Sequence, residues 1–497
     1  MNIDRRKFLL GSAATVALAG CATRRQGSRP LKPGEKRNVA MIGCGIQQRH
    51  LIREFANPAN GGNARIAAVC DCDRRRASEA GRYVESRYKD GSKCRVETDF
   101  RKILDDPSID MVSVATPDHW HAYICVEAMK RGKDVYCEKP LTWSVEEAVE
   151  MMKAEKKYGR IFQTGSMQRS WREFRDAVSL VRGGLIGNVA YVDANFGDKD
   201  RLTGGPSHPA RFWYKPENAA KEGAPNPDVD WEMWLGPAAR RPYSDQLSPR
   251  GVHNFFPMFW RCDDDLANGY CGDWGAHQLD IAQWGLDCDS SGPVRVIRSD
   301  EPHSTNLFHG GRRQFGLGMV FRKPWGDVLL RHGSTALNWG TVFYGEKGIV
   351  AVNRGRIAVW TGTGLVKPTA EIRKRLAEGS FMPEKRFAFS SGRDTPALAG
   401  ELDKIEKAFA AEIAKAGVYR SENHVRNFCE CVETRKPTIT PASVGCRTSI
   451  LCRLCNTSYK YDTGFDWDPD AFRFANGTGR NIPLGRPGGS NGWEVEA

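Results

Sequence analysis

The chain has 497 residues, of which 40% are hydrophobic and 27% are charged. This length exceeds what one hydrophobic core ordinarily holds, so two domains are expected. No stretch after the N-terminus is apolar enough to span a bilayer, which excludes a multi-span membrane protein. The net charge of +13 fits attraction to nucleic acid or to acidic glycans. Because the basic residues are scattered and no nucleic-acid motif is present, we expect no nucleic-acid partner.

The N-terminus has the pattern of an export signal. Arg5 and Arg6 precede a basic-apolar triplet and a short apolar run at 9–18, which resembles a twin-arginine signal. The segment 18–21, LAGC, resembles a bacterial lipobox and predicts lipidation of Cys21. We therefore expect a periplasmic protein whose only membrane contact is this lipid anchor. The alternative is a cytoplasmic protein with a chance basic-apolar start.

Fifteen cysteines are present, and several lie in apolar strand-like runs where buried free thiols are usual. Folding in the reducing cytoplasm before export explains free thiols in an exported protein. A CxxC pair lies close in sequence to two more cysteines, which raises the question of a zinc site. The segment SILCRLCNTSY has the pattern of a helix with one apolar face, so we expect core packing and no metal. The residues are Cys44, Cys70, Cys125 and Cys137 in strands, and Cys429, Cys431, Cys452 and Cys455 near the end.

A β-rich run, NVAMIG at 38–43, leads into a glycine turn and a helix. Gly43 permits the tight turn, and Gly45 lets a pyrophosphate approach the backbone at the helix N-terminus, where Ile46 and Gln47 follow. The third position of the fingerprint holds a glutamine in place of the glycine that normally allows close helix–strand packing. The pattern predicts a dinucleotide-binding fold, although a GxG alone is weak support.

A second apolar strand, RIAAVC, ends at Asp71. An acidic residue that binds the cofactor ribose is expected at this position. Its carboxylate would accept hydrogen bonds from the 2′- and 3′-hydroxyls of the NAD ribose. Arg74 and Arg75 offer partners for a 2′-phosphate, so NADP is not excluded. An alternative role for Asp71 is capping the next helix.

Strand, loop and helix patterns continue to about residue 165 and predict a doubly wound parallel sheet. Polar loops follow each strand, and the carboxyl ends of parallel strands meet in one crevice. We therefore expect one cofactor site lined by the glycine turn, Asp71 and two further loops. Their candidate residues are Thr116, Pro117, His119 and His121 in the first loop, and Glu138, Lys139 and Pro140 in the second.

The segments VATPDHWHA, CEKPL and GDWGAHQLDIAQWGL resemble the Gfo/Idh/MocA family of oxidoreductases. The resemblance covers nearly the whole chain after residue 36. It implies an α/β fold with an N-terminal Rossmann domain and a C-terminal α+β domain built on a large, mainly antiparallel sheet. The expected boundaries are a signal at 1–21, a linker at 22–36, the NAD(P)-binding domain at 37–165, the substrate and oligomerisation domain at 166–474 and a tail at 475–497.

The resemblance also implies roles for individual residues. Lys139 would contact the reacting sugar hydroxyl, and Pro140 would shape the nicotinamide pocket. The DxxxH pair Asp273 and His277 resembles the family's substrate and proton-transfer pair, while His121 resembles a residue near the nicotinamide ribose. Expected substrate neighbours are Gln168, Arg169 and Tyr270.

The chemistry of these side chains agrees with alcohol oxidation. A histidine suits the removal of the hydroxyl proton, and the Lys139 ammonium would stabilise the developing alkoxide. Asp273 and His277 are four residues apart in a predicted helix and would share a face. The alternatives are a satisfied interior histidine, a helix cap at Asp273 and a surface lysine at 139.

From about residue 166 the strand patterns become those of an antiparallel sheet. One face of such a sheet often packs on another subunit, so we expect a homo-oligomer, a dimer or a tetramer. Several tryptophans suit a carbohydrate pocket, although most tryptophans are structural. They are Trp213, Trp231, Trp234 and Trp260. The Gly- and Asn-rich tail is expected to wrap a neighbour or to stay loose.

Three functions follow. The first is oxidation of a secondary hydroxyl of a sugar or glycoside by NAD that stays bound and is recycled internally, because free cofactor is scarce outside the cytoplasm. The second is a redox-assisted glycosidase, which oxidises C3, eliminates the glycosidic group after loss of the C2 proton, adds water and reduces the ketone. Its extra base would be His277 or Tyr270. The third is a non-catalytic sugar-binding protein, against which the intact Lys139, Asp273 and His277 argue.

Overall fold

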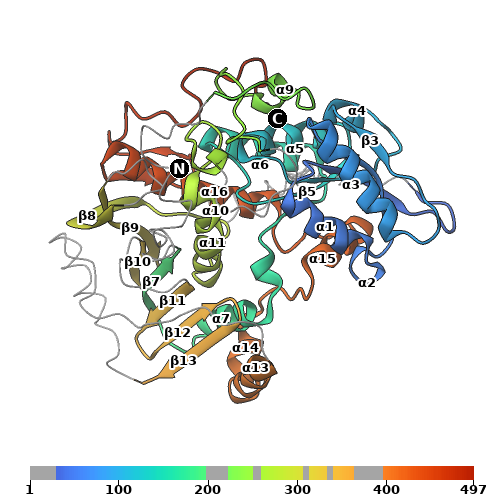
Figure 1. Cartoon of the computed structure of the whole chain (residues 1–497). Coiled ribbons are helices and arrows are strands. Elements are labelled where there is room, and N and C mark those ends of the chain that lie inside the picture. The colour runs from blue at the N-terminus through green and yellow to red at the C-terminus, as the bar shows by residue number, and fades with distance from the viewer. Residues whose placement is uncertain (1–29, 197–221, 250–258, 306–312, 333–339, 363–395) are drawn as a thin grey trace, which may run out of the picture.

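The computed structural model describes residues 30–196, 222–249, 259–305, 313–332, 340–362 and 396–497. The predicted signal with Cys21, most of the linker and Trp213 lie outside these residues. Within the described part of the chain, no helix is both long and apolar enough to cross a membrane. Figure 1 shows two folding units, one around each of two sheets.

The first unit is a six-stranded sheet with strand order β3-β2-β1-β4-β5-β6. Every neighbouring pair is parallel. The chain order reverses between β1 and β4, which is where a doubly wound sheet opens a crevice for a ligand. The strands are β1 (Arg37–Ile42), β2 (Ala64–Cys70), β3 (Arg95–Glu97), β4 (Met111–Val114), β5 (Asp134–Cys137) and β6 (Phe162–Thr164).

Helices cover both faces of this sheet because successive strand residues point to opposite sides. Val39 and Met41 of β1 pack in one apolar cluster, and Ala40 and Ile42 pack in another. Side chains cap the start of some of these helices: α6 begins with a capping box between Ser144 and Glu147. The helices are α1 (Ile46–Ala56), α2 (Pro58–Gly61), α3 (Arg74–Arg87), α4 (Phe100–Leu104), α5 (Asp118–Lys130) and α6 (Val145–Tyr158).

The second unit is a nine-stranded sheet with order β13-β12-β11-β7-β10-β9-β8-β14-β15. Only the β7–β10 pair is parallel among these strands, so the sheet is mixed and mainly antiparallel. The predicted fold class is therefore confirmed. The strands are β7 (Val189–Asn195), β8 (Arg295–Thr305), β9 (Arg313–Lys323), β10 (Gly326–His332), β11 (Gly340–Gly345), β12 (Gly348–Asn353), β13 (Arg356–Thr361), β14 (Phe465–Asp468) and β15 (Arg473–Phe474).

Helices of this second unit join the two sheets. The helices α7 and α11 pack on the large sheet, and α16 packs against both α11 and α6 of the first unit. The remaining short helices lie between the sheets or at the surface. The elements are η1 (Met167–Ser170), α7 (Arg172–Arg182), α9 (Trp231–Leu235), η4 (Phe259–Cys262), α10 (Gly269–Asp273), α11 (Gly275–Gly285), α13 (Pro396–Ala408), α14 (Ala410–Ala416), α15 (His424–Thr434) and α16 (Ala442–Tyr461).

Two late segments return to the first unit. Helix α15 lies beside α1 and α2, far from the large sheet in the sequence-coloured view (Figure 1). The tail after residue 475 also packs on the first unit: the Trp493 ring lies 4.9 Å from that of Trp120 on α5. The tail thus packs on the first unit of its own chain, which differs from the expectation of a loose end or an arm around a neighbour.

The cysteines that the sequence singles out are free thiols in the interior. Cys452 and Cys455 lie on α16 in the main apolar cluster, as expected for core packing. Among the described residues, no group of three or more His, Cys, Asp or Glu side chains is arranged to hold a metal ion.

Candidate active site

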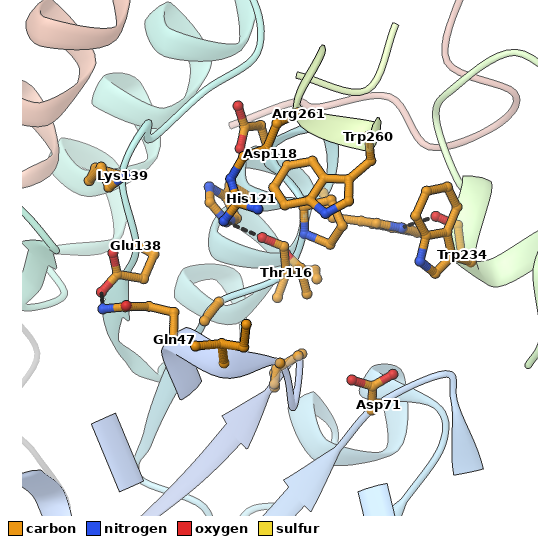
Figure 2. A pocket seen from close by; sticks show the side chains of 18 of the residues that line it. Gln47, Asp71, Thr116, Asp118, His121, Glu138, Lys139, Trp234, Trp260 and Arg261 are labelled. Atoms are coloured by element: carbon orange, nitrogen blue, oxygen red, sulfur yellow. Dashed lines mark hydrogen bonds between the residues drawn. The ribbon is translucent and has the colours of Figure 1, made fainter. Parts of the chain in front are cut away.

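A cavity of about 500 Å³ opens at the carboxyl ends of the parallel strands, a volume within the range of small-molecule sites. Residues that follow each of β1, β2, β4 and β5 line it, as the sequence predicts for a parallel sheet. Figure 2 shows Asp71 and Lys139 at opposite ends of this space. Its opposite wall comes from the second unit.

The glycine turn forms the floor of the cavity. Gly43 has a φ of +85°, and a Cβ there would lie 2.8 Å from the backbone of Ala115. A larger residue is therefore excluded both by conformation and by space. Gly45 is the N-cap of α1, and a Cβ there would meet nothing within 4 Å. This leaves open space in front of the helix N-terminus, where an anionic group is favoured. Ile46 and Gln47 complete this part of the lining.

Gln48 explains how the fold tolerates the missing third glycine. Its side chain is fully buried between α1 and β4, and its amide donates to the main-chain oxygen of Ser113 at 3.3 Å. The amide nitrogen of the longer side chain therefore has a partner inside the domain, and the helix still packs on the strand, although Gln48 Oε1 is buried without a hydrogen-bond partner among the described residues.

Asp71 holds the glycine turn in place. Oδ2 accepts from the backbone N–H of Cys44 at 2.7 Å, and Oδ1 accepts from that of Asp73 at 2.8 Å. The capping role considered for Asp71 belongs to Asp73, whose side chain accepts from the first turn of α3. Arg74 and Arg75 both pair with Asp228 and point away from the cavity lining.

The loop after β4 sends its two histidines in different directions. His121 lines the cavity, and its ring nitrogens lie 2.8 Å from the main-chain oxygens of Thr116 and Pro140 (Figure 2). Burial lowers the pKa of His121 to about 4, so the ring is neutral at neutral pH. Thr116 and Pro117 also line the cavity.

His119 corrects the sequence prediction. Its ring is buried away from the cavity lining, with nitrogens 3.1 and 3.2 Å from the main-chain oxygens of Trp234 and Leu266. Residues two apart on a helix lie on nearly opposite faces, so His119 and His121 cannot both face the cavity. His119 therefore anchors the second unit to α5.

The loop after β5 supplies the charged centre of the site. Lys139 Nζ donates to Asp273 Oδ1 at 2.6 Å and to the Asp273 main-chain oxygen at 3.0 Å. Glu138 accepts from Gln47 Nε2 at 2.9 Å (Figure 2), and burial raises the pKa of this carboxyl. The surface-lysine alternative is wrong, because the Lys139 side chain is only 15% exposed. Pro140 lies behind the lining and contributes its carbonyl to His121.

Asp273 and His277 both line the cavity but do not share one helix. Asp273 is the last residue of α10, and α11 begins after a break at Trp274. The capping alternative for Asp273 is also wrong, because α11 has no side-chain cap. Burial favours the neutral carboxyl, but Lys139 and Arg261 outweigh it and bring the pKa of Asp273 below its ordinary value.

His277 is a buried neutral base. Burial, reinforced by the charges of Lys139 and Arg354, lowers its pKa well below that of an ordinary histidine. Its Nδ1 has no hydrogen-bond partner among the described residues, so the alternative of a satisfied interior histidine is wrong. A buried nitrogen without a partner, in a wall of the cavity, is available to accept a proton from a ligand.

The three expected substrate neighbours are placed differently. Arg169 does not line the cavity; its guanidinium is 1% exposed and bonded to Asp280 and Asp289 at 2.7–2.8 Å. Gln168 is also buried behind the lining, where its Oε1 accepts from Arg354 Nε at 3.0 Å. Tyr270 lies on α10, but its side chain is outside the described part of the structure.

Of the predicted tryptophans that the structure describes, some line the cavity and one lies behind its wall. Trp234 and Trp260 line the cavity (Figure 2). Trp231 lies behind, stacked on Trp234 with 4.6 Å between ring centroids, and therefore supports the wall.

Sequence reasoning missed several lining residues, and four of them bear on the chemistry of the cavity. Asp118 begins α5, directly after the Thr-Pro of a quoted motif, and burial raises the pKa of its carboxyl to about 7. Arg261, Trp274 and Arg354 come from the second unit. The first lies over the Trp260 ring and the last over the Trp274 ring, each 4.5 Å from the ring centroid.

Two family models match this chain. Residues 37–166 match the model described as "Oxidoreductase family, NAD-binding Rossmann fold", and residues 205–313 match "Oxidoreductase family, C-terminal alpha/beta domain". Both are models of one family. Over these two segments the chain belongs to the Gfo/Idh/MocA family of oxidoreductases.

The curated relatives align with only part of this chain. Inositol 2-dehydrogenase 2 of Saccharopolyspora erythraea is 31% identical over 199 residues, which is 40% of this chain and 53% of the relative. Glycosyl hydrolase family 109 protein 2 of Shewanella sp. (strain ANA-3) is 28% identical over 213 residues, which is 39% of this chain and 46% of the relative. The chain thus spans about half the length of these relatives.

Solved structures extend the fold comparison over most of the family member. The aldose-aldose oxidoreductase of Caulobacter crescentus aligns with a TM-score of 0.51 and 18% identity, covering 87% of this chain and all of that protein. At this identity the likeness shows the shared two-domain fold.

Proposed function

We propose that this chain oxidises a secondary hydroxyl of a sugar or glycoside, using NAD that stays bound and returns to its starting state in each cycle. The observation that carries the proposal is the meeting of an ion pair, Lys139–Asp273, with the partnerless buried nitrogen of His277 in one cavity. A cation and a neutral base are the two groups that alcohol oxidation requires.

The lining fits NAD. Gly43, Gly45 and the N-terminus of α1 would hold its pyrophosphate, as the open space in front of Gly45 allows. Asp71 would hold the adenosine ribose: its carboxylate has about four acceptor positions, and only two are used by backbone N–H groups. His121 and Glu138 lie toward the Lys139 end of the cavity (Figure 2). When bound, NAD supplies a hydride acceptor.

The residues of the chain perform the rest of the chemistry. The Lys139 ammonium binds the substrate hydroxyl oxygen and stabilises the negative charge that develops there. His277 takes the hydroxyl proton at Nδ1, because burial keeps this nitrogen unprotonated. Asp273 orients Lys139 through two contacts, at 2.6 and 3.0 Å. The names of an inositol dehydrogenase and an aldose-aldose oxidoreductase among the similar proteins support this reaction class.

A redox-assisted glycosidase is the second candidate, and a specific feature favours it. Asp118 is an additional proton-transfer group in the same cavity, with a pKa raised by burial to about 7. Elimination after oxidation at C3 needs such a group to take the C2 proton. The glycosyl hydrolase family 109 relative, at a similar level of identity, supports this alternative.

Proton NMR of the purified protein in deuterated water, with a panel of glycosides and no added cofactor, separates the two candidates. A keto-glycoside, or turnover only when a second sugar acts as acceptor, supports the oxidoreductase. Free sugar carrying deuterium at C2 supports oxidation and elimination and rejects the simple oxidoreductase. Sugar binding without any turnover rejects both.

We also propose twin-arginine export and a lipid anchor at Cys21, on the strength of the N-terminal motifs. Replacing Arg5 and Arg6 together by lysine should keep the protein in the cytoplasm. Mass spectrometry of the mature N-terminus should find a lipidated cysteine, and an unmodified Met1 in the periplasmic fraction would contradict the proposal.

A further inference from the structure

Arg354 places a positive charge in the substrate half of the cavity. It lies in the turn between β12 and β13 and lines the wall that also carries Trp274 and His277. Its guanidinium carbon lies 5.3 Å from the Trp171 ring centroid and 4.5 Å from that of Trp274. Two aromatic rings and a hydrogen bond to Gln168 at 3.0 Å therefore hold it in one position.

The contacts with Gln168 and two tryptophan rings fix the position of the guanidinium but do not balance its charge. No carboxylate lies within 4.0 Å of it in the part of the chain that the structure describes, and only its Nε is used in a side-chain hydrogen bond there. The terminal nitrogens Nη1 and Nη2 form a planar fork of donors that suits a carboxylate. The Arg354 side chain is only partly exposed, and among the described residues no carboxylate is in direct contact with it, so a site with this geometry favours an anionic ligand.

The charges around Arg354 point in the same direction. Asp273 is committed to Lys139 at 2.6 Å and lies 3.7 Å from Arg261. Two carboxylates, Asp273 and Glu173, act on the charge of Arg354, but Asp273 is shared with the two other cations of the substrate half. Asp118, whose pKa is about 7, adds only part of a negative charge at neutral pH. The pyrophosphate of the cofactor belongs at the glycine turn of the other wall, so it does not supply the missing charge.

We propose that Arg354 makes this cavity selective for sugars or glycosides that carry a carboxylate, which Nη1 and Nη2 bind in bidentate fashion. The inference rests on the proposed sugar site and names its substrate class. A bound carboxylate would also neutralise one of the two positive charges that lower the pKa of His277. The base would therefore become stronger when the acidic substrate is in place.

Matched pairs of methyl glycosides test this: each glucuronide, galacturonide or mannuronide against its uncharged hexoside, with the 6-O-sulfated hexoside as a third member. Binding to the NAD-loaded full chain is measured by calorimetry, and turnover is measured separately. We expect the uronide of at least one pair to bind at least about 10-fold more tightly than its hexoside. Arg354→Gln should remove this preference, mainly through KM, and Arg354→Lys should keep part of it.

Arg356→Gln is the matched control, since this exposed arginine is the first residue of β13, two positions after Arg354, and should leave the preference unchanged. The inference is overturned if each uronide binds no more tightly than its hexoside, or if no uronide binds. It is also overturned if the sulfated sugar is preferred to the uronide, or if Arg354→Gln keeps the preference for the uronide. Turnover of neutral sugars without a uronide preference would overturn it and leave the proposed oxidoreductase standing. Arg354-dependent uronide binding without any redox turnover would support the inference about Arg354 and contradict the proposed oxidoreductase.

Discussion

The ammonium of Lys139 lies 2.6 Å from Oδ1 of Asp273, so the end of β5 is tied to the end of α10 across the cavity. The contact joins the cofactor wall to the substrate wall and holds the cation beside the partnerless nitrogen of His277. Both partners are largely buried, with side chains 15% and 12% exposed. A pair in this position is expected to set geometry and charge for catalysis.

Lys139→Ala should therefore lower kcat by about 100- to 1,000-fold, the usual loss when one group that stabilises a developing oxyanion is removed. Steady-state rates on the best sugar and single-turnover reduction of bound NAD measure this. Lys153→Ala is the control, because that lysine is 61% exposed and pairs with a neighbour on its own helix. A rate within about threefold of the wild type would contradict a catalytic role. A non-catalytic binding protein would bind sugar as before and show no turnover even with Lys139.

Asp71 should make the chain prefer NAD over NADP. Its carboxylate faces the cavity at the end of β2, where a 2′-phosphate would add a second negative charge. We expect NADP to bind at least about 10-fold more weakly than NAD, since one such charge conflict costs about 1.4 kcal/mol or more. Asp71→Ser should bring the dissociation constants of NAD and NADP closer together. Fluorescence titration with each cofactor measures both constants.

The arginines beside Asp71 provide the control. Arg74 and Arg75 pair with Asp228, so Arg74→Ala and Arg75→Ala should leave the ratio of the two dissociation constants unchanged. Tighter binding of NADP than NAD, lost in either arginine variant, would show that these side chains turn to a 2′-phosphate.

Parallel topology made the cofactor half of the site predictable. Once the strands were placed, Gly43, Asp71, Thr116 and Lys139 had to converge, because the carboxyl ends of parallel strands meet at one edge. Orientation on a helix decided the failures. The sequence pattern does not tell which of His119 and His121 faces the cavity, and the break after Asp273 divides a stretch whose spacing favoured one continuous helix.

The substrate half depended on contacts between distant segments. Arg354 lies in a hairpin turn far along the chain from every motif, and no local pattern marks it. The family resemblance placed Arg169 near the sugar. Its guanidinium is instead hydrogen-bonded to two aspartates that come more than 100 residues later in the chain. Asp118 was within reach of sequence reasoning, since it follows a Thr-Pro at the start of a helix and faces the same crevice.

Asp118 predicts a specific pH dependence of stability. Its pKa is about 7 in the folded protein and about 3.9 when unfolded. The contribution to stability is therefore complete below pH 3.9 and is lost as the pH rises through 7. A shift of about 3 units corresponds to a loss on the order of 4 kcal/mol.

Asp118→Asn cannot ionise, so its free energy of unfolding should fall less than that of the wild type between pH 5 and pH 8. Urea unfolding at several pH values measures the difference, and the other titrating groups are the same in both proteins. Asp105→Asn, at a 65% exposed side chain, should follow the wild-type curve. Parallel curves for Asp118→Asn and the wild type would contradict the raised pKa.

The tail should stabilise the cofactor domain. Trp493 lies 4.9 Å from Trp120, which lines the cavity, and 5.1 Å from Tyr123. Trp493→Ala should lower the free energy of unfolding by about 3 kcal/mol and release bound NAD faster. Cofactor retained after dialysis and urea unfolding measure the two effects. Glu494→Ala, at the exposed neighbouring position, should change neither.

Arg169 and Arg354 should give opposite phenotypes. Arg169 Nε and Nη2 both bond to the buried Asp280 at 2.8 Å, and Asp289 binds the remaining side of the guanidinium. Arg169→Gln leaves a buried carboxylate without its partner, which should cost about 3–5 kcal/mol of stability. Because Arg169 does not line the cavity, the protein that still folds should keep the wild-type KM. Arg354→Gln should instead keep the melting temperature and raise KM. Thermal unfolding and initial rates on the same preparations compare the two, and a raised KM with unchanged stability in Arg169→Gln would return that residue to the substrate site.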